Sequence, residues 1–470
     1  MDVLFHRRVN FIDEVKEIID KTPAGCHQTR HEILRELKAS RSRTTTTTGS
    51  GWRREPVTFA RAGWHDVGYY RRLLDGVDPV LPQQLAAGPA VNSLTLRVSW
   101  PPEHCATTGF IASAHDDLLA LCLGDCYSFF HSWRHLPGCY LVLNTRAKSV
   151  AVVPTLPANW LRDDDHYSPH HPIASAGVAV LRTDDDGGYL LAELYRHSTD
   201  RGFPTNKATL FTWCSPRSGS GDGGPRAGAH QWIRKEVMLP LPVPDDEYDF
   251  FNFNAGTVFA VSSTSLCWVD LWAGILVCNN ISSSTAGTAA GDDDDDDDED
   301  GLVFTFIPLP VVCGHRPFDS TEYRSVRCLD TETIKLVCMD GGEEVTVALT
   351  TWTLKFPLST DGGWRWEKDE DASCSSLCVA DLLDDAIPVG GGGDNKRRLR
   401  RRIVSWPVVG RARPGVAHVF VHDLEYKSKE NQWAVTESYE VSLDVPRRKV
   451  VSVFTLPAGS WSRAHMIMSL

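Results

Sequence analysis

The sequence predicts a mainly β protein, and the arrangement of its strands favours a β-propeller. Three observations carry this prediction: an apolar run with two tryptophans, four apolar strands that end in Leu-Pro, and hairpins joined by Gly-containing loops. Propellers repeat a blade of antiparallel strands about every 40–50 residues. We therefore expect roughly six to eight blades from the roughly 400 residues that show this pattern.

The apolar run extends from Trp268 to Cys278 and is interrupted at Gly274. We interpret it as a buried strand that turns into a second one. Strands this apolar need cover on both faces, so they belong to a large architecture of stacked sheets.

Four strands share a Leu-Pro ending. Proline cannot donate a hydrogen bond to a neighbouring strand, so each ending indicates the end of a strand or the edge of a sheet. These strands span residues 150–157, 237–242, 304–310 and 451–457.

Antiparallel hairpins are predicted between these edges. Asp-Gly loops are strong hairpin signals, and they occur in the first two of three pairs. The paired segments are 178–182 with 189–195, 334–339 with 345–349, and 419–426 with 433–441.

The chain divides into an N-terminal extension, residues 1–50, and a propeller-like domain, residues 51–470. The extension contains two short amphipathic helices, near residues 11–20 and 29–38, followed by a Thr-rich linker. Three segments have too few apolar residues to order themselves and are expected to be disordered insertions. They are residues 216–229, 282–301 and 389–402.

The charge pattern disfavours a nucleic-acid-binding body. The nine acidic residues from Asp292 to Asp300 supply most of the net charge of −13, and no basic face is evident in the remainder. No apolar stretch has the length of a signal peptide or a membrane span. The 13 cysteines follow no regular spacing. We therefore expect reduced cysteines, no membrane association and an intracellular location, in the cytoplasm or the nucleus.

The run from Trp268 to Cys278 and the later Ile-Pro-Leu-Pro strand resemble a plant family expanded in grasses, the domain-of-unknown-function family 1618. Residues 112–157 also fit its pattern. The resemblance implies kinship with the propeller-shaped regions that follow F-box motifs in plant ubiquitin-ligase receptors, but no activity. Its signature positions, expected to be structural, are Trp268, Asp270, Leu271, Trp272, Gly274, Pro308 and Pro310.

The chain departs from the receptor plan at its start. The first 60 residues lack an F-box-like pattern of three helices with an opening Leu-Pro. A direct role as a ligase adaptor is therefore not expected.

Two groups of residues could supply metal ligands. Thiolates and imidazoles at Cys122, Cys126, His131 and His135 suit tetrahedral zinc, although their central spacer is shorter than that of a zinc finger. His166, His170 and His171 follow three aspartates, as in a hydrolytic metal site.

Structural explanations compete with both metal sites. Cys122 lies in an apolar run typical of a core strand, and the later histidines lie in a proline-containing polar loop. Cys374 and Cys378 form an isolated pair. We therefore assign no metal, no cofactor and no catalytic residue.

A basic cluster follows four consecutive glycines. It can be interpreted as a nuclear-import signal, as a partner for the acidic run, or as a solvated loop. Its residues are Lys396, Arg397, Arg398, Arg400, Arg401 and Arg402.

The sequence therefore favours a non-enzymatic, propeller-like scaffold whose loops bind another protein or a peptide. Two alternatives remain: a metal-dependent hydrolase-like propeller that uses the His166 region, and a nuclear regulatory protein. The oligomeric state is left open.

Overall fold

The computed structural model describes most of the chain. It leaves aside residues 1–3, 23–28, 45–50, 58, 60–66, 83–90, 101–108, 125–137, 157–170, 173–177, 184–187, 200–202, 216–230, 243–250, 282–301, 311–322, 341–347, 357–363, 370–376, 379–381, 384–385, 388–399, 411–412, 414, 428–429, 457–466 and 470.

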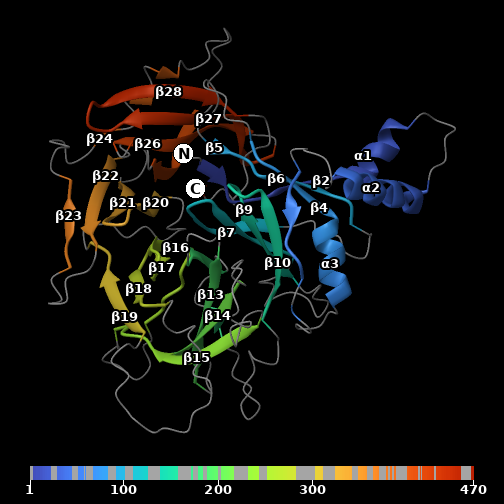
Figure 1. The fold of residues 1–470 in the computed structure, drawn as a ribbon. Helices are drawn as coiled ribbons and strands as arrows, with labels where there is room; N and C mark the ends of the chain where they lie inside the picture. Colours follow the sequence, from blue (N-terminus) through green and yellow to red (C-terminus); the bar gives the residue numbers. More distant parts are fainter. Residues whose placement is uncertain are drawn as a thin grey trace, which may run out of the picture.

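Six sheets form the blades of a β-propeller, which confirms the predicted fold class (Figure 1). Five of them have a complete set of antiparallel strands. From the ring centre outward, these are β7 (Gly109–His115), β8 (Leu118–Leu123), β9 (Cys139–Asn144) and β10 (Ser149–Pro154); β12 (Ala179–Arg182), β13 (Tyr189–Ser198), β14 (Pro204–Cys214) and β15 (Trp232–Met238); β16 (Thr257–Ser262), β17 (Ser265–Asp270), β18 (Gly274–Asn279) and β19 (Val303–Pro308); β20 (Arg324–Asp330), β21 (Thr333–Asp340), β22 (Ala348–Lys355) and β23 (Trp366–Lys368); and β25 (Arg400–Val409), β26 (Val416–Lys427), β27 (Gln432–Asp444) and β28 (Lys449–Thr455).

Three two-residue strands extend these sheets at their sides. They are β3 (Arg53–Arg54) beside β10, β11 (His171–Pro172) beside β13, and β24 (Leu377–Cys378) beside β22.

The sixth blade joins the two ends of the chain. In it, β1 (Leu4–His6) pairs antiparallel with β29 (Ile467–Ser469) and parallel with β5 (Val91–Asn92). Both chain ends accordingly lie near the ring centre in Figure 1.

The first residues of the predicted extension therefore belong to the ring. Phe5, Arg7 and Val9 are buried, and the Arg7 guanidinium donates to the carbonyl oxygens of Ile111 and Gly256 at 3.0 Å each. The boundary predicted at residue 50 does not anticipate that the first residues pair within the ring, because β1 and β29 are too distant in sequence to leave a local pattern.

The blades pack face to face through apolar layers. Every residue of β17 is buried, as expected for a strand covered on both sides. Leu266 and Trp268 face the preceding blade, whereas Cys267 and Val269 face the following one. The alternation of side chains along a strand thus places one strand in two cores.

The Leu-Pro strands lie where the sequence predicts. β10, β15, β19 and β28 are the outer strands of four blades. The three predicted hairpins also form, as β12–β13, β21–β22 and β26–β27.

A small module stands beside the ring. It consists of a sheet in the order β2 (Asn10–Asp13), β6 (Thr95–Val98), β4 (Val77–Val80) and of the helices α1 (Glu14–Lys21), α2 (Arg30–Thr44) and α3 (Val67–Asp75). Asp13 caps α1 by accepting hydrogen bonds from the backbone N–H groups of Val15 and Lys16. The two predicted helices therefore form, although they are shifted towards the C-terminus.

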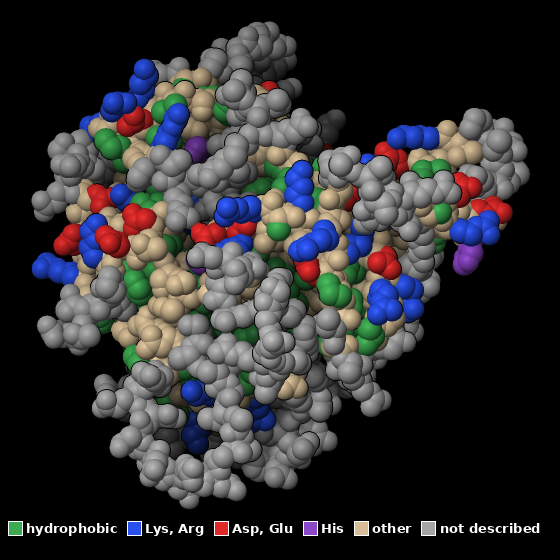
Figure 2. All heavy atoms as spheres, viewed as in Figure 1, with side chains coloured by type: hydrophobic (Ala, Val, Ile, Leu, Met, Phe, Trp, Pro, Cys, Tyr) green, Lys and Arg blue, Asp and Glu red, His purple; other side chains and the backbone are tan. Residues whose placement is uncertain are grey.

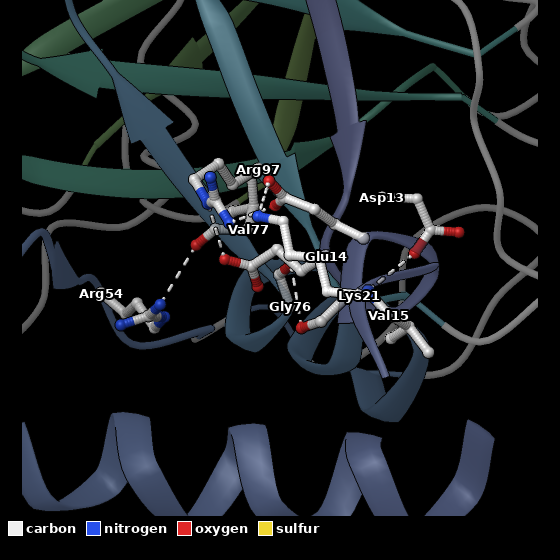
Figure 3. Close-up of polar contacts among 10 residues, drawn as sticks. Asp13, Glu14, Val15, Lys21, Arg54, Gly76, Val77 and Arg97 are labelled. Carbon is white, nitrogen blue, oxygen red and sulfur yellow. Dashed lines mark hydrogen bonds and ion pairs between the residues drawn. The ribbon is translucent and has the colours of Figure 1, made fainter. Parts of the chain in front are cut away.

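Arg97 on β6 fastens α1 to this sheet (Figure 3). Its guanidinium donates to Glu14 Oε1 at 2.9 Å and to Glu17 Oε2 at 2.7 Å. The hydrogen bond with Glu14 is the main cause of the raised pKa of Arg97. The hydrogen bond from Lys21, followed by that from Arg97, lowers the pKa of the Glu17 carboxyl.

One predicted insertion ends earlier than expected. β25 begins at Arg400, so the last three residues of segment 389–402 are paired with β26. Arg402 is fixed there by an ion pair with Asp423, Nε to Oδ1 at 2.8 Å. Residues 388–399 and the insertions 216–229 and 282–301 lie outside the described residues.

Across the part of the chain that the structure describes, no helix is both long and apolar enough to cross a membrane.

Candidate functional site

The structure describes one residue of the first predicted metal group. Cys122 lies in β8 and is fully buried, facing the apolar core of its blade. Cys126, His131 and His135 lie outside the described residues. Core packing accounts for Cys122.

Of the second group, His171 belongs to β11, where it pairs with Arg196 of β13. His166 and His170 lie outside the described residues, as does Cys374, whereas Cys378 belongs to β24. Within the described segments, no three His, Cys, Asp or Glu side chains are grouped so that they could hold a metal ion.

The two motifs of the family resemblance meet at one corner of the third complete blade, where β17 turns into β18 beside the end of β19. Gly274 pairs with Pro308, and the N–H of Leu309 donates to the Ala273 carbonyl at 3.4 Å. We call residues 270–274 and 308–310, together with Arg324, the signature corner.

The carboxylate of Asp270 organises the turn of this corner. Its Oδ1 accepts from the N–H of Trp272 at 2.7 Å and of Ala273 at 3.2 Å, while its Oδ2 accepts from the N–H of Asn254 at 2.7 Å. Burial raises the pKa of Asp270, against the effect of these three donors. The residue therefore acts as an internal cap for the turn.

Gly274 is required by a close approach between strands. A Cβ atom at this position would lie 2.4 Å from the Ile307 carbonyl oxygen, which is backbone and has little freedom to move. The absence of a side chain lets β18 and β19 meet directly behind the turn.

Trp272 projects from the turn and is 44% exposed, whereas Trp268 is fully buried. The Arg324 guanidinium lies over the Trp272 ring, 5.5 Å from its centroid, and donates to the Leu271 carbonyl at 2.8 Å. Arg324 comes from β20 of the next blade. A side chain of the next blade thus lies against the indole.

The next blade also supports the far side of the corner. Trp366 on β23 donates through Nε1 to the Pro308 carbonyl at 2.9 Å. The sequence identifies the signature residues but does not predict that Arg324 and Trp366 contact them, because neither belongs to a local motif that contains its partner.

The corner lies on a face of the ring that carries other exposed apolar side chains. We call upper face the end at which the second strand of each blade turns into the third, and lower face the opposite end. Phe203 ends the β13–β14 turn, Trp272 lies in the β17–β18 turn, and Trp433 follows the β26–β27 turn. Met238, the most exposed of the four at 64%, ends β15 on the same face.

The remaining exposed large apolar side chains of the described residues are distributed differently. Val303 and Val451 lie towards the lower face. Ile12, Ile19 and Val80 belong to the small module beside the ring. The aromatic and methionine side chains therefore gather on the upper face. On the face drawn in Figure 2, acidic and basic side chains are interspersed.

Two histidine–serine pairs lie across β26 and β27. Ser442 Oγ is 3.0 Å from His418 Nδ1, and Ser438 Oγ is 2.9 Å from His422 Nδ1. Glu440 Oε1 lies 3.9 Å from the same Nδ1 of His418. A catalytic relay places the acid and the nucleophile on opposite ring nitrogens, so this arrangement suits cross-strand linkage better than nucleophilic catalysis.

A buried carboxyl, Glu193, lies between two blades. Its Oε2 accepts a hydrogen bond from the Tyr195 hydroxyl at 3.0 Å. Burial raises the pKa of Glu193 to about 7, against the effect of hydrogen bonds from Tyr140 and Tyr195. The side chain is 3% exposed, so it lies within the packed layer.

Solved structures similar to this chain include β-propeller proteins, all at low similarity. The GH43 BlXynB protein from Bacillus licheniformis is 7% identical with a TM-score of 0.27, and the match covers 75% of this chain and 57% of that protein. The β-propeller domain of the Trilobed protease from Pyrococcus furiosus is 7% identical with a TM-score of 0.25, covering 74% and 92%. An α-L-arabinofuranosidase, CtGH43 from Clostridium thermocellum, is 10% identical with a TM-score of 0.24, covering 73% and 92%.

No curated protein matches the chain. A family model does match, over a segment that begins at Trp268 and contains the complete signature corner. Residues 268–418 match the family described as "Protein of unknown function (DUF1618)", which supports the resemblance to that family over this segment.

Proposed function

We propose that the protein is a non-enzymatic scaffold whose upper face binds another protein. The observation that carries this proposal is the gathering of Phe203, Met238, Trp272 and Trp433 on that face. Aromatic residues and methionine are enriched in protein–protein interfaces, and tryptophan is prominent among their energetic hot spots.

The packing of Trp272 supports the proposal. Its backbone is fixed by Asp270, and its ring lies against Arg324. A side chain that is already ordered before binding loses little conformational entropy when a partner covers it. Exposure of this indole to water in the free protein is unfavourable, so its burial by a partner would contribute favourably to the free energy of binding.

The kinship with propeller regions that follow F-box motifs in plant receptors is part of this proposal. The propeller fold and the family match over residues 268–418 are its support. The same proposal includes that the protein acts in the cytoplasm or the nucleus.

A paired capture experiment tests the role of the upper face. The full chain, an upper-face variant (Phe203→Ala, Met238→Ala, Trp272→Ala) and a lower-face control (Val303→Ala, Val451→Ala) are compared by quantitative affinity capture, after thermal unfolding has shown that all three fold. We expect proteins captured by the full chain and the lower-face control to be lost with the upper-face variant. Equal capture by all three would contradict the proposal.

A further inference from the structure

We propose that the signature corner binds an extended, proline-containing segment of the partner protein. This inference rests on the proposed function and specifies the chemistry of the segment that is recognised. It follows from the surface that the corner presents, from its backbone hydrogen bonds and from the charge beside its indole.

The corner presents a small apolar surface around one ring. Trp272 and Pro308 are exposed, and Ala273 and Pro310 are half-buried. These side chains come from the β17–β18 turn and from the end of β19, which are joined by the pairing of Gly274 with Pro308. An apolar segment that lies across the turn can therefore contact both strands' ends at once.

Donors of the corner's backbone are already engaged. The N–H groups of Trp272 and Ala273 donate to Asp270, and the N–H of Leu309 donates to Ala273. Addition of a β-strand depends on unpaired main-chain donors and acceptors along an edge. Recognition at the corner therefore rests on side-chain contact rather than on strand addition.

A polyproline II segment suits this kind of surface. Its backbone has no internal hydrogen bonds and stays solvated, and its preformed shape loses little entropy on binding. Proline rings pack against exposed aromatic side chains in known recognition modes of this class.

The Arg324 charge beside the Trp272 ring affects which residues can flank the prolines of the bound segment. The Arg324 guanidinium lies over the Trp272 ring, 5.5 Å from its centroid, and the residue is 7% exposed. A second cation stacked on the same indole would be repelled. We therefore expect prolines flanked by glutamate to bind more tightly than prolines flanked by lysine.

Fluorescence polarisation with labelled peptides tests the inference on the full chain. The probes are Glu-Pro-rich and Lys-Pro-rich decapeptides and a Gly-Ser decapeptide of the same length. We expect the Glu-flanked probe to bind best, although the net charge of −13 favours the Lys-flanked one at long range. Trp272→Ala should weaken binding about tenfold or more.

The control is Val451→Ala, because Val451 is 48% exposed and lies towards the lower face, outside the proposed binding surface. Its affinity should stay within about twofold of the unmodified chain. No binding of the proline probes, or equal losses in the two variants, would overturn the inference. If the proline probes fail while capture still depends on the upper face, the partner's chemistry is different but the proposed function stands; if both fail, both are overturned.

Discussion

Individual polar residues between the blades serve mainly to hold the ring together. Arg7 joins carbonyl oxygens of two blades, and Asp270 caps the turn of a third. Glu193 is the most unusual of them, because its carboxyl is buried beside tyrosine hydroxyls rather than beside a cation. Its protonation therefore has a direct effect on stability.

Stability should depend on pH through Glu193. Its pKa is raised from 4.5 to about 7 by burial, so the contribution of this group to stability is fully present below about pH 4.5 and is lost as pH rises to about 7. Glu193→Gln keeps the side chain neutral. We expect thermal unfolding midpoints of the variant and the unmodified chain to be close at pH 5, whereas at pH 8 the variant should be more stable by about 3 kcal/mol.

The decisive quantity for Glu193 is the difference in unfolding midpoint between the variant and the unmodified chain, measured at pH 5 and again at pH 8. A difference that stays constant across this range would show that the carboxyl does not change its protonation there.

Gly274→Ala should destabilise the signature corner. The added Cβ would lie 2.4 Å from the Ile307 carbonyl oxygen and would force β18 and β19 apart. We expect a loss of about 1–3 kcal/mol in the free energy of unfolding, measured by chemical denaturation. Gly51→Ala is the control, because no atom lies within 4 Å of its added Cβ; equal effects of the two substitutions would refute the explanation.

At the scale of elements, the sequence predicts strands better than their distant partners. Leu-Pro endings identify the outer strands β10, β15, β19 and β28 because proline is compatible with an edge. The β12–β13 and β26–β27 hairpins are predicted because their partners are close in sequence. The parallel pairing of β2 with β6 is not predicted, because 81 residues separate the end of β2 from the start of β6 and no local sequence pattern indicates the contact.

Arg97 should be the residue that keeps α1 in place. Arg97→Ala would leave the buried Glu14 without its guanidinium partner and would remove one of the two cations that bind Glu17. We expect amide hydrogen exchange in α1 to become about tenfold faster. Arg53→Ala, which removes an exposed ion pair with Glu55, should leave α1 unchanged. Unaltered exchange in the Arg97 variant would contradict this assignment.

At the scale of the whole molecule, the ring is closed by the two ends of the chain. β1 pairs with β29 across nearly the full length of the sequence. Neither strand carries a signal that identifies its partner, which explains why residues 1–50 were expected to be an extension. The signature corner shows the same limit: residues 270–274 and 308–310 are recognisable in the sequence, but Arg324 and Trp366 reach them from the next blade.

Removal of residues 1–9 should open the ring. This deletion takes away β1 together with the buried Phe5, Arg7 and Val9. We expect loss of a single cooperative thermal transition, or a midpoint lowered by more than about 10 °C. Phe5→Ala should produce a smaller decrease of the same sign. A truncated chain that melts within about 2 °C of the full one would contradict the closure.

Site-specific photo-crosslinking in cells tests most directly whether the upper face binds a partner. A photoreactive amino acid replaces Trp272 on the upper face or, as a control, Val451 towards the lower face; both side chains are exposed, 44% and 48%. We predict discrete protein adducts from position 272 and none from position 451. Adducts from position 451 alone, or no adducts from either position, would contradict the assignment of the upper face as the binding surface.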